Sequence, residues 1–317
     1  MVMVRPATWR GLYFYFLYLP KPIQYVLRGI LLFQIRSYTG CFLVILSLVW
    51  ASLSIFYGNA DYRFVLADLY IDIGLIYWVF NSGRNQNSSV RSFSINFIAL
   101  YIIFLCYMFY YGLDFTISDW RGDRLLSFFN GAAGIVLMSF GLNIMLIRKN
   151  VIWSVTFFLL LFASQSRMAL VAPFITYTFG MILTRRPKIA KFLTFLLVIM
   201  VFSSFLWLPL TGINGTGRFV IWLNILQEQD LIYWYGDIFE VLESISDSED
   251  QLHNLFLHIF LSRGIYIYLF LGLIVIRKLF SLIDLRLRYS YSTLLLFLLH
   301  STTDNVVLYS FLVPFIL

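Results

Sequence analysis

Charged residues are scarce in this sequence, in which Asp, Glu, Lys and Arg together make up 12% of the chain. Soluble domains carry about 25%, so this scarcity excludes a protein with an ordinary water-facing surface. Hydrophobic residues make up 61% and aromatic residues 20%, and they gather in long continuous runs. Because lipid offers the backbone no hydrogen-bond partners, such runs predict an all-α polytopic membrane protein.

Cysteine is also rare. Cys41 and Cys106 both lie inside apolar runs, and two such cysteines provide neither a disulfide framework nor a zinc site. The apolar start of the chain has no small-residue cleavage site after it, so we expect it to be retained rather than removed as a signal peptide.

Nine apolar segments are long enough to predict membrane-spanning helices. They cover residues 39–57, 64–80, 93–112, 127–147, 151–166, 168–184, 190–210, 255–276 and 291–304. Residues 11–36 and the end of the chain, 306–317, are two weaker candidates, which gives about 9–11 helices. We treat residues 1–317 as a single integral membrane domain.

The basic residues of the connections fall on alternate sides of the predicted spans. One side carries Arg84, Arg91, Arg148, Lys149, Arg185, Arg186, Lys188, Lys191, Arg277, Lys278, Arg286 and Arg288. By the positive-inside rule that side is the cytoplasm. The rule also accounts for the formal net charge of +7, so no nucleic acid is needed to explain it.

The segment 211–253 lies on the other side and is strongly acidic. It holds eight of the 16 acidic residues of the chain, and its only basic residue is Arg218. A segment of this length is too long for a mere connection, which favours a working loop. We expect this loop to be extracytoplasmic.

Arginines on the outer side are candidates for binding a phosphate or pyrophosphate, which a guanidinium group grips with two parallel hydrogen bonds. They are Arg63, Arg121, Arg124, Arg167, Arg218 and Arg263. The alternative is that they reach lipid phosphates at the membrane surface. Arg263 is predicted to lie about 13 Å deep in its helix, where it must face a cavity or a partner.

Histidines near the outer boundary are candidates for proton transfer. His253 directly precedes a helix that Asn254 is suited to cap, and the positive end of the helix dipole favours a neutral, proton-accepting ring. The alternative is a polar surface residue. His258 points to another face of the helix and is expected to be a satisfied buried histidine. His300 stays open beside Asp304.

A different class of protein is suggested by one pair of carboxylates. Asp68 and Asp72 are four residues apart on the second predicted span and so share a helix face. Such a pair can bind a cation in a secondary transporter. A transporter or flippase is therefore kept as an alternative, although we find no internal repeat of the kind that such proteins show.

The order of the polar motifs resembles that of bacterial O-antigen ligases and Wzy-type O-antigen polymerases. In that family a Ser-Arg pair follows one span, an Arg-x-x-x-Trp opens the main periplasmic loop, and His-Asn begins the next span with a glycine about ten residues further on. The matching residues here are Ser166, Arg167, Arg218, Trp222, His253, Asn254 and Gly264. The resemblance covers roughly residues 113–276.

The resemblance implies a metal-independent type-C glycosyltransferase in the bacterial inner membrane, with residues 211–253 on the periplasmic side. Its donor would be an oligosaccharide on undecaprenyl diphosphate, with His253 as general base. The diphosphate and the glycan would be bound by Arg121, Arg124, Arg167, Arg218, Arg263, Asn254 and Trp222. For Trp222 the alternative is packing at the level of the lipid headgroups. The resemblance implies no metal and no cofactor. A flippase and a chain-length regulator would be partners, together with membrane lipid.

Within this family we expect a polymerase, which joins repeat units of O-antigen, capsule or exopolysaccharide. The alternative is a ligase, which transfers finished glycan to lipid A–core. The motifs are shared between the two activities, so both stay open at this point.

Overall fold

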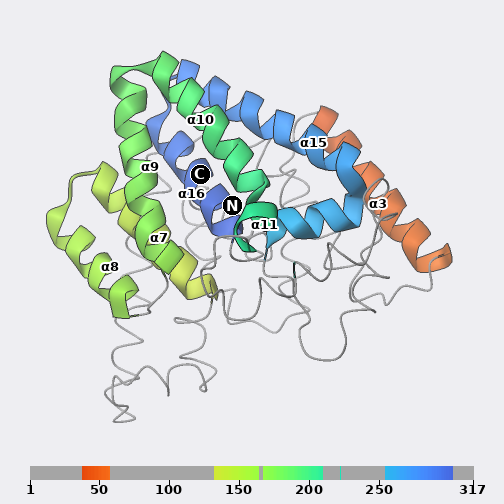
Figure 1. Cartoon of the computed structure of the whole chain (residues 1–317), viewed down its shortest axis with the longest axis horizontal. Helices are drawn as coiled ribbons and strands as arrows, with labels where there is room; N and C mark the ends of the chain where they lie inside the picture. The colour runs from red at the N-terminus through yellow and green to blue at the C-terminus, as the bar shows by residue number, and fades with distance from the viewer. Residues whose placement is uncertain (1–37, 58–131, 164–166, 210–221, 223–253, 303–317) are drawn as a thin grey trace, which may run out of the picture.

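The structure is a computed structural model of the chain, and it describes residues 38–57, 132–163, 167–209, 222 and 254–302 (Figure 1). These residues are helical apart from turns, and no strand occurs among them, which confirms an all-α fold for this part of the chain. The helices are α3 (Tyr38–Tyr57), α7 (Ala132–Ile147), α8 (Val151–Ala163), α9 (Arg167–Arg185), α10 (Pro187–Phe202), α11 (Ser204–Trp207), α15 (Leu255–Asp284) and α16 (Arg288–Ser301).

Seven of the nine predicted spans fall wholly or mostly on described residues, and the described part of each is helical. Residues 190–210 contain most of α10, the bend at Ser203 and all of α11. The predicted spans 64–80 and 93–112, the segments 11–36 and 306–317, and the loop 211–253 apart from Trp222 lie outside the described residues.

The helix predicted to end at residue 276 extends further. α15 continues to Asp284, so that Arg277 and Lys278 lie on the helix rather than in a connection. Its apolar stripe continues past them through Leu279 and Leu282, which are fully or almost fully buried. Long basic side chains can stay on a helix next to apolar surface because their charged ends reach outward.

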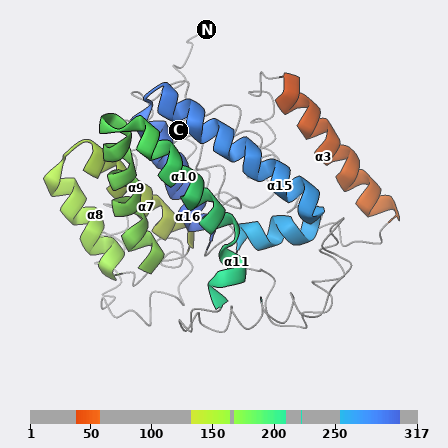
Figure 2. The ribbon, with the colours of Figure 1, turned by 45° about the horizontal axis from the view of Figure 1, so that its top comes forward.

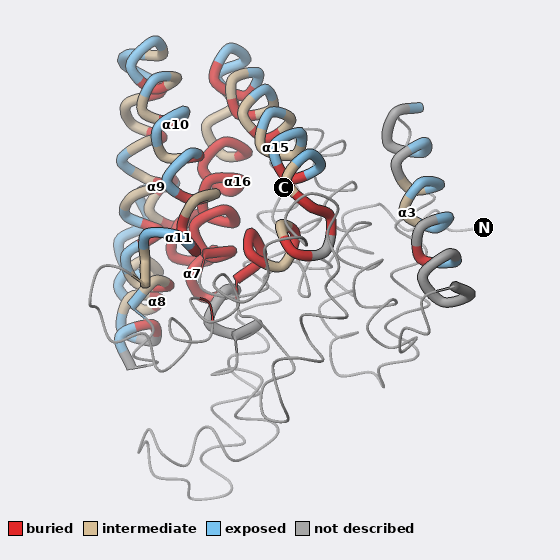
Figure 3. The backbone as a smooth tube through the Cα atoms, turned by 45° about the vertical axis from the view of Figure 1, so that its right-hand side comes forward, coloured by how far each residue is buried: buried red, intermediate tan, exposed pale blue. Residues whose placement is uncertain are grey.

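Helix α16 lies at the centre of the bundle. Every residue from Ser290 to Ser301 is buried, and the tube drawing shows α16 surrounded by other helices (Figure 3). Its neighbours are α7, α9, α10 and α15. α3 lies apart from them, on the far side of α15 (Figures 1 and 2).

The outer faces of α10 and α15 are apolar and uncovered. Phe192 is 62% exposed on α10, and Tyr266 and Leu273 are 63% and 66% exposed on α15. Continuous apolar surface of this kind is rare on soluble monomers and is typical of contact with lipid. Two helices, Arg167–Arg185 and Arg263–Asp284, are long and apolar enough to cross a membrane. Both observations support association with a membrane.

Two of the short connections are built in the same way. The second residue after each of α7 and α15 lies in the left-handed region, Lys149 at φ 58° and Arg286 at φ 54°. The amides of Lys149 and Asn150 donate back to the carbonyls of Leu146 and Met145 over 3.1 and 3.0 Å. This is the pattern of a Schellman motif, and it reverses the chain within a few residues.

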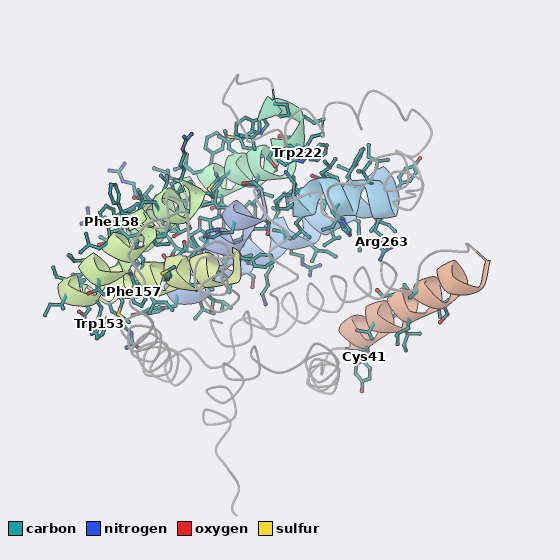
Figure 4. All side chains as sticks on the ribbon, turned by 90° about the horizontal axis from the view of Figure 1, so that it is seen from below. Cys41, Trp153, Phe157, Phe158, Trp222 and Arg263 are labelled. Atoms are coloured by element: carbon teal, nitrogen blue, oxygen red, sulfur yellow. The ribbon has the colours of Figure 1, made fainter. Side chains whose placement is uncertain are left out.

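Helices α7 and α8 approach closely at a glycine. A Cβ atom placed on Gly141 would lie 2.7 Å from Cζ of Phe157, closer than side-chain atoms normally come. The Phe157 ring is 2% exposed and is labelled on α8 beside Trp153 (Figure 4). The absence of a side chain at residue 141 therefore lets the aromatic ring fill the space between the two helices.

Candidate functional site

Side-chain hydrogen bonds fix which helix ends meet in the bundle. They join Ser139 to Ala169, Asn143 to Thr176, His300 to Ser139 and Ser292 to Asn143. The first two pairs show that α7 and α9 are parallel, and the other two show that α16 is antiparallel to both. The last turns of α7 and α9 and the first turn of α16 therefore lie at one end of the bundle.

We call this end the basic end because it carries Arg148, Lys149, Arg185, Arg186, Lys188, Arg286 and Arg288. Arg288 donates from Nη2 to Sδ of Met181 over 3.1 Å, near the end of α9. Lys191, early in α10, lies 2.6 Å from the carboxylate of Asp284 at the end of α15. The connections after α7, α9 and α15, which the sequence predicts to be cytoplasmic, thus lie at the same end of the bundle.

The opposite end of the bundle, which we call the candidate end, contains two of the predicted site residues. Arg167 is the first residue of α9, and its side chain is exposed. Asn254 lies directly before α15 and contacts Thr302, which follows the last turn of α16. The structure therefore brings the starts of α9 and α15 to the same end, although the motifs are far apart in sequence.

Asn254 is fully buried, and both polar atoms of its side chain are used. Oδ1 accepts from the amides of Phe256 and Leu257 over 2.9 and 3.0 Å, which confirms the predicted N-cap. Nδ2 donates to the carbonyl of Thr302 over 3.1 Å and to Oγ of Ser204 over 3.3 Å. Asn254 thus joins the start of α15 to α11 and α16, while a contact with substrate stays a prediction.

α15 is broken at Gly264, which has φ 71° and ψ 174°. This backbone region is open essentially only to glycine. The break divides α15 into a first leg, residues 255–263, and a second leg, residues 265–284, which diverge sharply (Figures 1 and 2). Arg263 is the last residue of the first leg and is 9% exposed.

The bend changes the helix geometry from which the depth of Arg263 was predicted. The sequence suggested one straight span from residue 255, because residues 264–276 alone are too short to cross a bilayer. The helix instead continues to Asp284, and Arg263–Asp284, with 22 residues, is itself long enough. Arg263 therefore lies at the beginning of the apolar stretch and not nine residues inside it.

Trp222 is 2% exposed and belongs to the apolar core. Its ring is therefore packed in this structure, and a contact of Trp222 with the glycan stays a prediction. The other candidates, His253, Arg218, Arg121 and Arg124, lie outside the described residues.

A chain of buried hydrogen bonds connects three helices close to the candidate end. Pro173, inside α9, has no amide hydrogen to donate to the carbonyl of Ala169. Ser139 of α7 donates to that carbonyl from Oγ over 2.9 Å. His300 of α16 lies 2.8 Å from the same Oγ through Nε2. The carbonyl that the proline leaves without its helical partner is thus satisfied by a neighbouring helix.

A second polar cluster lies one turn nearer the basic end. Oδ1 of Asn143 accepts from Oγ1 of Thr176 and from Oγ of Ser292, both over 2.9 Å. We did not predict either cluster from the sequence. The available signal was the spacing of Ser139 and Asn143 on α7, four residues apart and therefore on one face of an otherwise apolar helix.

No group of three or more metal-binding side chains converges within the ranges that the structure describes. Comparisons with protein-family models, curated proteins and solved structures give no significant match for this chain. The described helices define the class as a helical, membrane-associated protein. One end of its bundle is basic, and the other carries Arg167 and Asn254.

Proposed function

We propose that this protein joins oligosaccharide repeat units carried on undecaprenyl diphosphate, at the outer face of the bacterial inner membrane. The product would be O-antigen, capsule or exopolysaccharide. The observation that carries the proposal is that Arg167 and Asn254 lie at the same end of the bundle, opposite the basic end. In the sequence these residues belong to two separate motifs of the family that the chain resembles.

The orientation follows from the same arrangement. The basic end faces the cytoplasm, and the opposite end faces the periplasm together with the acidic loop 211–253. The uncovered apolar faces of α10 and α15 contact lipid tails. A donor held in the membrane by its polyprenyl chain then reaches the site from the bilayer, with its diphosphate at the level of the candidate arginines.

The chemistry needs a base and a group that stabilises the leaving diphosphate. His253 directly precedes Asn254 in the chain and accepts the proton of the attacking sugar hydroxyl. The hydroxyl oxygen bonds to the anomeric carbon of the donor, and the bond from that carbon to the diphosphate oxygen breaks. Arg167, Arg218 and Arg263 stabilise the negative charge on the departing undecaprenyl diphosphate. None of these steps calls for a metal.

The test is a surface-polysaccharide ladder from a deletion strain. The strain is complemented with wild type, with His253→Ala or with Arg218→Ala, at matched levels in the membrane. We expect the deletion to leave a single repeat unit on the lipid core and both variants to reproduce that defect. Matched controls are His258→Ala, on the same helix as the motif, and Arg277→Ala, near the basic end, which should restore the ladder.

Two other outcomes distinguish the alternatives. Bare core together with accumulated lipid-linked polymer identifies a ligase. A normal ladder from both variants refutes the catalytic assignment and favours a transporter or flippase, in which Asp68 and Asp72 should matter instead. Purified protein in lipid nanodiscs, supplied with the lipid-linked repeat unit extracted from the deletion strain, should lengthen it without added metal.

A further inference from the structure

The last turn of α16 connects the two helix starts that lie at the candidate end. On one side Thr302 accepts from Nδ2 of Asn254 over 3.1 Å, which holds the start of α15. On the other side His300 is bonded through Ser139 to the carbonyl of Ala169. Ala169 is the second residue after Arg167 in the first turn of α9.

The direction of each hydrogen bond can be assigned. The Ala169 carbonyl can only accept, so the hydroxyl of Ser139 donates its single proton to it. The lone pairs of Ser139 then remain for His300, whose Nε2 must carry a proton and donate over 2.8 Å. The order is therefore His300 to Ser139 to Ala169, and each member is buried, at 3%, 0% and 0% exposure.

Burial makes this connection rigid. In a low-dielectric interior a hydrogen bond is strong, and a polar group left without one is strongly disfavoured. The last turn of α16 is also closed by Ser301, which donates to Phe297, and by Thr302, which donates to Leu299. The turn therefore has little freedom to shift relative to α9 without breaking buried bonds.

From these contacts we infer that His300, with Ser139, is a positioning pair for the proposed active site. The pair sets the distance between the start of α9, with Arg167, and the start of α15, which follows His253. This inference rests on the proposed function, because a base and a diphosphate-binding arginine must be held at a fixed separation. Displacing such groups by about 1 Å can lower the rate about a hundredfold.

The experiment measures kcat and KM in nanodiscs, with the lipid-linked repeat unit extracted from the deletion strain. His300→Leu and Ser139→Ala should each lower kcat at least about tenfold, with KM changed less than about threefold, because misplaced groups act mainly on the transition state. The double variant should have about the same kcat as either single variant, since both substitutions remove the same connection. His300→Gln, which can donate from Nε2, should restore most of the activity.

The matched control is a buried pair elsewhere on the same helix. Tyr291 of α16 lies 2.5 Å from Oγ1 of Thr194 on α10, nearer the basic end. Tyr291→Phe breaks this contact and should lower thermal stability to a similar extent as Ser139→Ala, while leaving kcat unchanged. Equal losses of kcat in the control and in His300→Leu would mean a purely structural role and would overturn the inference.

A distance measurement separates this inference from the proposed function. Spin labels at residues 167 and 258, in a cysteine-free background, report the separation of the starts of α9 and α15. His300→Leu should shift or broaden the distance distribution, whereas His300→Gln and Tyr291→Phe should not. An unchanged distribution in His300→Leu refutes the positioning role. Wild-type protein that does not lengthen the lipid-linked unit refutes the proposed function, whatever the distances show.

Discussion

The side-chain amide of Asn254 donates to the backbone carbonyl of Thr302 over 3.1 Å, across 48 residues of sequence. The same side chain caps α15 through its oxygen. One buried residue therefore both begins a helix and attaches it to the central helix of the bundle. Two separate contributions to stability follow, and substitution can distinguish them.

Asn254→Ala should remove both contributions. Loss of the cap costs about 1 kcal/mol, and the Thr302 carbonyl left without its donor costs about 1–3 kcal/mol. Asn254→Ser keeps a capping oxygen but cannot reach Thr302, so it should be about 1 kcal/mol more stable than the alanine variant. Denaturant titration in detergent micelles measures the free energies of unfolding. Equal values for the two variants would show that the cap contributes nothing.

Gly264→Ala should destabilise the protein by about 1–3 kcal/mol, because its φ of 71° and ψ of 174° are strained for any side chain. It should also lower the proposed activity by moving Arg263. Gly272→Ala on the same helix is the matched control, since its Cβ would lie 3.4 Å from Phe202, close to an ordinary contact. Equal stability of the two variants, measured by the same titration, would argue against a fixed bend.

Gly141→Ala should also destabilise, for a different reason. The new Cβ would lie 2.7 Å from Cζ of Phe157, and overpacking of this kind costs about 1–3 kcal/mol. Replacing the ring by a smaller side chain makes room, so Phe157→Leu combined with Gly141→Ala should be more stable than the sum of the two single effects predicts. A double-mutant cycle measures this coupling. Strict additivity would mean that the two residues do not crowd each other.

The proposed orientation is tested by labelling from the two sides of the membrane. The background carries Cys41→Ser and Cys106→Ser. In it, Lys149→Cys and Arg286→Cys should react with a membrane-impermeant maleimide only after the membrane is permeabilised. Arg167→Cys, at the other end of the bundle, should react in intact spheroplasts. Labelling of all three positions from the same side would contradict the two ends described above.

Hydropathy was sufficient to predict the described helices, because long apolar runs bounded by basic residues leave few alternatives to a helix. It did not reveal the bend at Gly264. Residues 255–276 form one continuous apolar run, whereas a change of helix direction depends on a single pair of backbone angles. Glycine permits such angles but does not require them, so the sequence alone predicted one straight helix through Arg263.

The candidate site was predicted in part. The Asn254 cap is a local signal, since its partners lie two and three residues further on, and sequence reasoning found it. His300 was left open because its partner, Ser139, is 161 residues away. The need for that partner arises from Pro173 on a third helix. Contacts of this kind depend on how helices pack, and a hydropathy pattern carries no information about the pairing.

The burial of α16 has a consequence for how the protein is made. The helix that fills the centre of the bundle is synthesised after α7, α9, α10 and α15, which surround it. Until the ribosome has produced His300 and Ser292, Ser139 and Asn143 have only their partners on α9 and lack those that α16 provides. The nascent helices must therefore be kept from closing on one another, and a chain that stops before Arg288 should be recognised by membrane quality-control proteases and degraded.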